Sequence, residues 1–424
     1  MLFDWLIARN MKTILHAIVF LSVSFYGTIC AAENVKPTLF GMHVHSLAHV
    51  SSWPSVPFGF IRLWDSKVKW LDIEPKNGAW NFDVIDNYVE NAEKNNAQIM
   101  LTLGQTPPWA ASRPREEGVY GKGANSEPRD MADWENYVRT LATRYKGRIR
   151  HWEVWNEANV EHFYSGNWAT LAELERRAAM VLKAVDASNV VLTPSIQGGA
   201  FNRLDAYFEA GGGRHADVIS YHFYAPLDEP EVIADRIKRV RGVMAKHGMQ
   251  HKPLWNTETG WLIANSDGGF GRQQRPAWAK WRKLGYEEAA GVVMRVFLIN
   301  LAGGVNHVFW YAWDNGAMGL AEDKGRKPKP AAMAYARAME WLVGADWRGC
   351  AVRDQVWMCE LARGGESQHI VWSQTQRGFD IPRAWGVRSI VNLDAGVSAV
   401  PSSARIDVGP EPRLLRQVLP DGRG

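Results

Sequence analysis

The sequence predicts an α/β fold in which a (β/α)8 barrel, the TIM-barrel architecture, is followed by a small β domain. Short apolar runs alternate with helical patterns over residues 33–345, and the pattern changes after Gly344. Alternating strands and helices favour a parallel sheet. Eight such runs in roughly 300 residues favour closure of that sheet into a barrel.

The eight predicted strands are apolar runs rich in β-branched and aromatic residues, at 39–45, 58–64, 98–104, 149–156, 190–195, 218–224, 254–257 and 305–313. Helical periodicity is found at 84–93, 134–145, 171–185, 204–209, 232–246, 286–301 and 331–342. No clear helical pattern separates the first two strands. Further short strands, separated by Gly-, Arg- and Asp-rich turns, predict a small β-sandwich-like domain over 346–424, at 356–361, 369–374 and 389–393.

Residues 1–32 have the pattern of a signal peptide. Lys12 precedes an apolar stretch at 13–29, and Cys30 and two alanines then supply small residues for cleavage. We therefore expect an exported protein, periplasmic or extracellular. The apolar stretch approaches membrane-spanning length, so an uncleaved anchor that associates the protein with a membrane is the alternative.

Charge and cysteine content narrow the class of protein. The chain has 49 basic and 45 acidic residues, a net charge of +4, and no basic run, which argues against a nucleic-acid partner. We expect a monomer. Cys350 and Cys359 are spaced to face each other across a hairpin, which predicts a disulfide in an oxidising compartment. Two buried thiols are the alternative.

Two glutamates stand out at the ends of predicted strands. Glu157 closes Trp-Glu-Val-Trp-Asn-Glu (152–157), and Glu258 lies in Trp-Asn-Thr-Glu-Thr-Gly-Trp (255–261). In a barrel the carboxyl ends of the strands meet at one rim, which is where chemistry occurs. A carboxylate pair can hydrolyse a glycosidic bond, one as acid and the other as nucleophile or base. Glu153 lies deeper in the fourth strand and is predicted to be a structural buried acid.

Other side chains at strand ends share this rim. Alternation places His222 and Tyr224 on one face of the sixth strand, and Arg62 ends the second strand. Arg62 and His222 also have ordinary explanations, as a structural ion pair and as a satisfied core histidine. Trp313, after the eighth strand, is predicted to be a flat platform for a sugar ring. Trp310 has the opposite parity and is expected to pack against helices.

Three motifs support a resemblance to a known group of enzymes: Trp-Asn-Glu (155–157), Thr-Glu-Thr-Gly-Trp (257–261) and Thr-Pro-Pro-Trp-Ala (106–110). The chain resembles clan A of the retaining glycoside hydrolases, and within it most closely family 39, over residues 35–345. That family includes xylosidases, iduronidases and exopolysaccharide-cleaving endoglycosidases. Ala158 departs from the pattern, because the clan often has proline there, but this alters a turn and no reacting group.

The resemblance implies a role for each matching residue. Glu157 would be the acid/base and Glu258 the nucleophile. Asn156 would bind the sugar 2-hydroxyl, and Tyr224 and Arg62 would keep the nucleophile ionised. No cofactor is implied.

Long loops at 105–130 and 262–284 carry aromatic and basic residues, including Arg113. Long loops in a compact barrel are usually functional or mobile. They favour an endo-acting enzyme that grips a bacterial exopolysaccharide or other extracellular polysaccharide. An exo-acting, xylosidase-like enzyme is the alternative.

Trp109 and His45 are further expected substrate contacts. A metal-dependent barrel hydrolase is a weaker alternative, because His43 and His45 have the spacing of a metal pair, to which His222 and Asp314 could add ligands. Against it, the predicted fourth strand offers no bridging lysine and the fifth no histidine.

Overall fold

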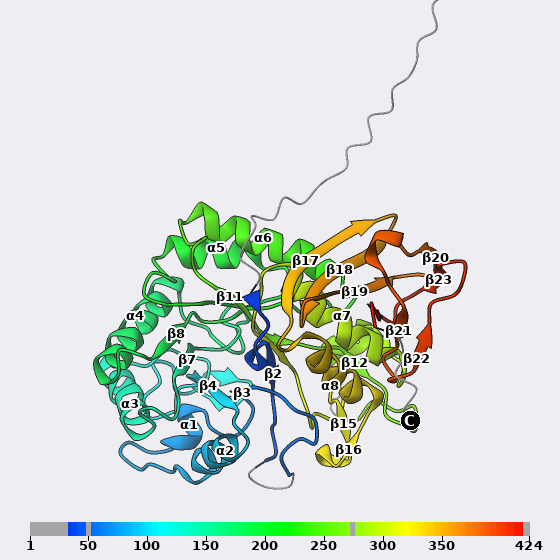
Figure 1. Cartoon of the computed structure of the whole chain (residues 1–424). Helices are drawn as coiled ribbons and strands as arrows, with labels where there is room; N and C mark the ends of the chain where they lie inside the picture. The colour runs from blue at the N-terminus through cyan, green and yellow to red at the C-terminus, as the bar shows by residue number, and fades with distance from the viewer. Residues whose placement is uncertain (1–32, 48–51, 272–275, 419–424) are drawn as a thin grey trace, which may run out of the picture.

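The computed structural model describes residues 33–47, 52–271 and 276–418. The predicted signal peptide lies outside these residues. Within them, no helix has both the length and the apolar character needed to cross a membrane. The ribbon in Figure 1 shows a barrel with helices around it and a β domain beside it.

The barrel is a closed parallel sheet, as predicted. Its strands follow the order β8-β7-β4-β3-β2-β14-β11-β10-β9, and every neighbouring pair is parallel. The two ends of this order, β8 and β9, both belong to the predicted fifth strand, and a parallel bridge joins Leu192 to Val218. Pro194 separates β8 from β9 and lacks the N–H that a continuous strand needs. The barrel therefore has eight strand positions.

The barrel strands have these bounds: β2 Phe40–Met42, β3 Phe60–Leu63, β4 Gln98–Leu103, β7 His151–Val154, β8 Val190–Leu192, β9 Ile196–Gln197, β10 Ile219–His222, β11 Leu254–Thr259 and β14 Val308–Trp310. Loops beyond their ends contain short pairs: β5 Glu117–Gly118 with β6 Gly121–Lys122, β12 Leu262–Ile263 with β13 Lys283–Leu284, and β15 Ala321–Glu322 with β16 Lys327–Pro328. These pairs add structure to loops that the sequence left without elements.

Each predicted helix is present: α2 Asp83–Lys94, α3 Met131–Arg144, α4 Trp168–Val185, α5 Phe201–Glu209, α6 Val232–Lys246, α7 Glu288–Ala302 and α8 Pro330–Leu342. A short α1 (Trp70–Ile73) and the 3-10 turns η1 Pro37–Leu39, η2 Pro276–Lys280, η3 Asp323–Gly325 and η4 Arg383–Trp385 were not predicted. Residues 291–300 of α7 are all buried, because that helix is covered by its neighbours and by the second domain.

The second domain is built on an antiparallel sheet in the order β1-β17-β18-β19-β24-β21-β22. Its first strand, β1 (Glu33–Asn34), comes from the start of the described chain and pairs with β17. The other strands are β17 Asp346–Arg353, β18 Val356–Arg363, β19 Glu366–Ser373, β21 Ser389–Val391, β22 Val397–Ala399 and β24 Arg413–Arg416, with β20 Arg377–Asp380 and β23 Arg405–Val408 forming a separate pair.

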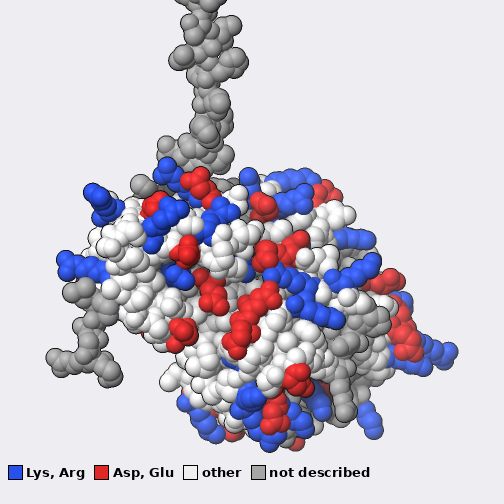
Figure 2. Space-filling model, turned by 90° about the vertical axis from the view of Figure 1, so that its right-hand side faces the viewer, with Lys and Arg blue, Asp and Glu red and all other residues white. Residues whose placement is uncertain are grey.

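The disulfide between Cys350 and Cys359 joins directly opposite residues of β17 and β18, which confirms the predicted pairing. This sheet lies beside α7 and α8 (Figure 1). A buried polar link fixes the contact, since Glu231 accepts hydrogen bonds from Arg295 of α7 and from the Trp372 indole of β19. On the face in Figure 2, basic and acidic side chains are interspersed, in keeping with the low net charge.

Candidate active site

Glu157 lies in a strained turn directly after β7. Its φ is 44° and that of Trp155 is 75°, in the left-handed region that residues with a side chain seldom adopt. Ser195, just after the break in the fifth strand, holds the turn: its Oγ accepts from the Glu157 N–H at 2.9 Å, and its carbonyl accepts from Ala158 at 3.0 Å. Strain that is held in this way is common at functional sites.

Trp155 supports the same turn from below. A Cβ on Gly104 would lie 2.8 Å from the indole ring of Trp155, so a side chain there would displace the ring. The indole N–H donates to the carbonyl of Phe163 at 2.8 Å. Trp155 is therefore a packing residue that fixes the position of Glu157.

Glu258 lies within β11, near its carboxyl end. The pairing of β11 with β14 slips between Asn256 and Thr259, a bulge that re-aims the side chains it contains. Two donors contact the Glu258 carboxylate. Arg62 Nη1 lies 2.7 Å from Oε2, and the Tyr224 hydroxyl donates to Oε1 at 2.8 Å. Both contacts stabilise the charged form, as the sequence predicted.

Arg62 is fully buried and organises the floor of the site. Besides Glu258, its guanidinium donates to Glu153 and, at 2.7 Å, to Asn156 Oδ1. Glu153 also accepts from Thr102 at 2.7 Å and from Ser220 at 2.6 Å. The prediction that Glu153 is a structural buried acid is confirmed. Because the Asn156 oxygen is used by Arg62, its amide N–H groups are the side that can donate to a ligand.

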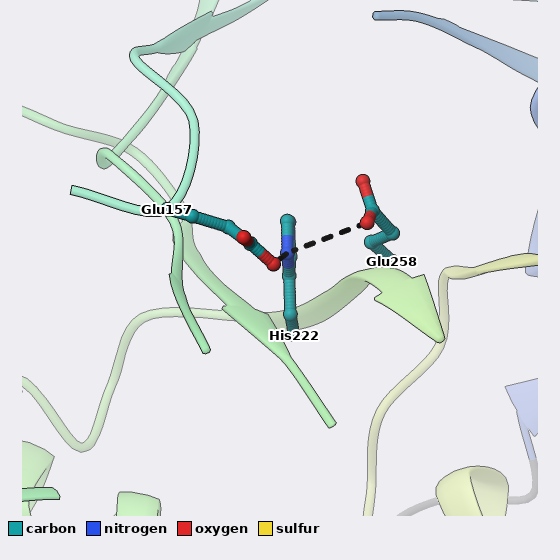
Figure 3. A group of neighbouring side chains, drawn as sticks. All are labelled: Glu157, His222 and Glu258. Atoms are coloured by element: carbon teal, nitrogen blue, oxygen red, sulfur yellow. Dashed lines mark hydrogen bonds and ion pairs between the residues drawn. The ribbon is translucent and has the colours of Figure 1, made fainter. Parts of the chain in front are cut away.

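His222, at the end of β10, lies between the two glutamates. Figure 3 shows the three side chains pointing toward one another. The His222 Nδ1 is 3.0 Å from a Glu157 oxygen and 4.0 Å from a Glu258 oxygen. Burial lowers the pKa of His222 well below its ordinary value, so the imidazole is neutral. One carboxylate oxygen of each glutamate and a ring nitrogen of His222 all lie within 4.8 Å of one another.

The protonation of the pair follows from these contacts. Burial raises the pKa of Glu258 to about 7, while Arg62 and the Tyr224 hydroxyl act in the opposite direction. Two carboxyl groups this close titrate as a pair, so the raised pKa belongs to the site and not to Glu258 alone.

Sequence comparison assigns the chain to a protein family. The profile of the Cellulase family (glycosyl hydrolase family 5) matches residues 59–316, more than half of the chain. The chain belongs to this family. The predicted resemblance to clan A glycoside hydrolases is thereby confirmed.

Individual relatives are more distant. A β-xylosidase from Geobacillus stearothermophilus is 27% identical over 205 residues, which are 42% of this chain and 40% of the relative. The chain thus matches less than half the length of that curated relative. A family 39 glycoside hydrolase from Bacteroides cellulosilyticus WH2 has a TM-score of 0.69 at 17% identity, covering 90% of this chain and 81% of that one. A monomeric β-xylosidase from Caulobacter crescentus CB15 has a TM-score of 0.61 at 16% identity, covering 91% and 97%. These structural likenesses show the fold.

Trp313 is the main correction among the predicted site residues. It is completely buried, and its indole N–H donates to the Gly325 carbonyl at 3.1 Å. The β15–β16 segment folds over it, with Ala321 bonded to the Trp313 carbonyl. A ring covered in this way offers no face to a sugar, so the predicted platform is wrong. Trp310 is also buried, against Trp261, which confirms its packing role.

The contacts of Trp109 are with residues other than the catalytic pair. Its indole N–H donates to the Glu74 carbonyl at 2.9 Å, and its ring packs edge-on against Trp70 of α1. The loop Trp281 is a better aromatic candidate, because its half-buried ring lies 5.9 Å from that of Tyr224. The loop basic residue Arg113 is used within the protein, where it pairs with Glu116 and Glu127.

Three rim residues were not among the predicted site residues: Asp65, Tyr120 and Tyr311. Asp65 follows β3 and accepts hydrogen bonds from both tyrosine hydroxyls. The predicted His45 belongs to the same group, with its ring 4.9 Å from that of Tyr311. A polar residue directly after a strand end was the available signal for Asp65, as it was for Glu157.

The residues that the metal-hydrolase alternative would need do not form one cluster of ligand atoms among the described residues. Among the described residues, two groups offer three ligand atoms close together, Glu157 with His222 and Glu258, and a surface group at Asp205. Neither contains His43 or His45. His43 Nε2 instead lies 3.2 Å from the Thr257 carbonyl, and Asp314 accepts from the backbone of His45 and Ser46.

Proposed function

We propose that this protein is a retaining glycoside hydrolase that cleaves O-glycosidic bonds within an extracellular polysaccharide. The observation that carries the proposal is the approach of the Glu157 and Glu258 oxygens to within 4.8 Å. Retaining enzymes hold their carboxyl groups about 5–5.5 Å apart, whereas inverting enzymes need about 6.5–9.5 Å to admit a water.

In the first step the Glu258 carboxylate attacks the anomeric carbon and the bond to the leaving oxygen breaks. Glu157 gives its proton to that oxygen. Asn156, whose oxygen is bound by Arg62, donates an amide N–H to the sugar 2-hydroxyl. The negative charge on Glu258 disappears as the ester forms, and Arg62 remains neutralised by Glu153.

In the second step water attacks the same carbon from the face that the leaving group vacated. Glu157, now a carboxylate, accepts a proton from that water, and Glu258 leaves as a carboxylate stabilised by Arg62 and Tyr224. The cycle returns the proton to Glu157 and the charge to Glu258. Two inversions at one carbon give net retention.

Endo action is supported by the long loops after β4 and β11. The first contains the β5–β6 pair and is braced by Arg113, while the second carries Trp278 and Trp281, whose rings lie 5.6 Å apart. Firm aromatic walls suit an extended chain better than a single sugar. The exo alternative is supported by the relatives named as β-xylosidases. We further propose that the protein is exported and monomeric.

One experiment tests reaction course and cleavage site together. Proton NMR of the first turnover on a β-linked xylo-oligosaccharide is expected to show product with the starting anomeric configuration, and chromatography to show internal cleavage products early. A first product with the inverted anomeric configuration would rule out the retaining mechanism. Release of single sugars alone from the chain end would favour the exo-acting enzyme.

A further inference from the structure

Asp65 forms a hydrogen-bonded group at the rim that the proposed mechanism does not use. Its carboxylate accepts from the Tyr120 hydroxyl and, at 2.7 Å, from the Tyr311 hydroxyl. The residue is half-buried, and its φ of 48° lies in the left-handed region. A strained, partly accessible carboxylate that is fixed by two aromatic hydroxyls is a costly arrangement for a surface turn, and such strain gathers where function requires it.

The place of Asp65 in the barrel relates it to the nucleophile. The strands β3, β2, β14 and β11 are neighbours in the barrel. Asp65, His45 and Tyr311 follow the ends of the first three within three residues, and Glu258 is the last residue but one of β11, so these side chains follow one arc of the rim. The charges of Asp65 and Glu258 also influence each other, since Asp65 raises the pKa of Glu258. The sugar that becomes attached to Glu258 must lie within reach of this arc.

The expected orientation of that sugar also brings its hydroxyls toward Asp65. Asn156 is bound to Arg62, which lies on β3, and in the proposed function it contacts the 2-hydroxyl. A ring whose anomeric carbon is at Glu258 and whose 2-hydroxyl is at Asn156 directs its remaining hydroxyls outward along the rim. Asp65 can accept from such a hydroxyl, because each carboxylate oxygen has a second lone pair beyond its tyrosine contact. The buried His45 Nε2 has no hydrogen-bond partner among the residues that the structure describes and adds a second polar atom.

The charge of this arc is unfavourable to an acidic sugar. Burial tends to raise the pKa of Asp65, but His45, Lys69 and the tyrosine hydroxyls hold it below its ordinary value, so the group is an anion. Two cations of this region, Arg62 and Lys69, are already engaged. Arg62 is shared by two glutamates, and the Lys69 ammonium lies 3.4 Å from Asp72 and 4.3 Å from the centre of the Tyr120 ring.

We infer that Asp65 binds ring hydroxyls of the sugar on the non-reducing side of the cleaved bond, and that this subsite selects a neutral sugar and rejects a uronate. The inference rests on the proposed glycosidase function and deepens it by naming the substrate class.

The test compares the wild type with Asp65→Asn on aryl β-xylobioside, aryl β-cellobioside and aryl β-glucuronide. The substitution preserves shape but removes the charge. A hydrogen bond to a charged group corresponds to about a 10- to 100-fold change in kcat/KM, so we expect that loss on the neutral substrates. The kcat/KM for the glucuronide should fall less, or rise, so the ratio of kcat/KM for neutral over acidic substrates should become smaller. Where glucuronide turnover is too slow to measure, the same preference is read from inhibition constants for xylose and glucuronate.

Asp86→Asn is the matched control. Asp86 also accepts a tyrosine hydroxyl, that of Tyr145 at 2.7 Å, but lies on α2 in the outer helical layer. Its substitution should leave kcat/KM and the neutral-to-acidic preference unchanged.

Two results would overturn the inference. A wild type that accepts the glucuronide as well as the neutral glycosides would do so. An equal loss of kcat/KM on all substrates in Asp65→Asn would also overturn it, because that result is expected if Asp65 only fixes the loop that contains Tyr120. The proposed function is tested separately, because wild-type turnover of these glycosides should be abolished by Glu258→Gln. If that holds and Asp65→Asn has the kinetics of the wild type, the result counts against the role of Asp65 alone.

Discussion

Glu258 extends from within a strand and receives hydrogen bonds from a buried arginine and a buried tyrosine, whereas Glu157 lies in a strained turn beyond a strand and contacts a neutral histidine ring. The two halves of the site suit different tasks. A nucleophile must keep one charge state and one position until it attacks, and fixed donors serve this need. An acid that later acts as a base must exchange its proton with solvent and substrate. The difference in their surroundings supports the proposed roles, with Glu258 as nucleophile and Glu157 as acid/base.

The largest expected effect separates the two glutamates directly. Glu258→Gln should abolish activity on every glycoside, because no covalent intermediate can form. Glu157→Ala should lose about 10²–10⁴-fold on unactivated oligosaccharides but retain the first step on aryl glycosides, whose leaving groups need no protonation. A burst followed by slow turnover should appear in stopped-flow absorbance, and azide should restore turnover to Glu157→Ala.

Similar behaviour of both variants on aryl glycosides, with no effect of azide, would show that the two roles are wrongly assigned. Glu153→Gln is not a suitable control, since Glu153 neutralises Arg62 beneath both groups.

A smaller effect concerns stability. Burial raises the pKa of Glu258 from its ordinary 4.5 to about 7, so between these values the folded protein binds more protons at this site than the unfolded chain does. Stability contributed by this site is thus present below pH 4.5 and is lost as the pH rises to about 7. The loss is about 3 kcal/mol for a shift of this size.

Chemical denaturation of the wild type and Glu258→Gln across this range measures the effect. The free energy of unfolding of the wild type should fall relative to that of the variant as the pH rises. A difference that is constant with pH would mean that Glu258 is already ionised at pH 4.5.

The smallest effect tests one donor. Tyr224→Phe removes the hydroxyl that stabilises the Glu258 carboxylate, which should reduce kcat/KM about tenfold. The acidic limb of the pH–rate profile should also move to higher pH, because the pKa of Glu258 rises further. Tyr221→Phe is the control: Tyr221 lies on the same strand, but its hydroxyl donates to the Gly198 carbonyl, away from the pair. A profile that does not move would show that Tyr224 contributes no electrostatic stabilisation.

The sequence by itself determined the strand and helix order and the positions of Glu157 and Glu258. The periodicity of apolar residues reports burial locally, and the carboxyl ends of parallel strands must converge in a barrel. The buried role of Glu153 followed from the same alternation. The spacing of Cys350 and Cys359 indicated their pairing across a short hairpin, with two buried thiols as the alternative.

Tertiary structure decided what depends on contacts between distant segments. Trp313 lies at a strand end, yet the segment containing Gly325 folds over it, and no local pattern reports that covering. Asp65 meets Tyr311 across 246 residues, and β1 joins a sheet formed by the opposite end of the chain. The side chain that a residue meets is set by the closure of the whole barrel, so a strand end indicates a place on the rim, while only the fold determines whether that place is open to a sugar.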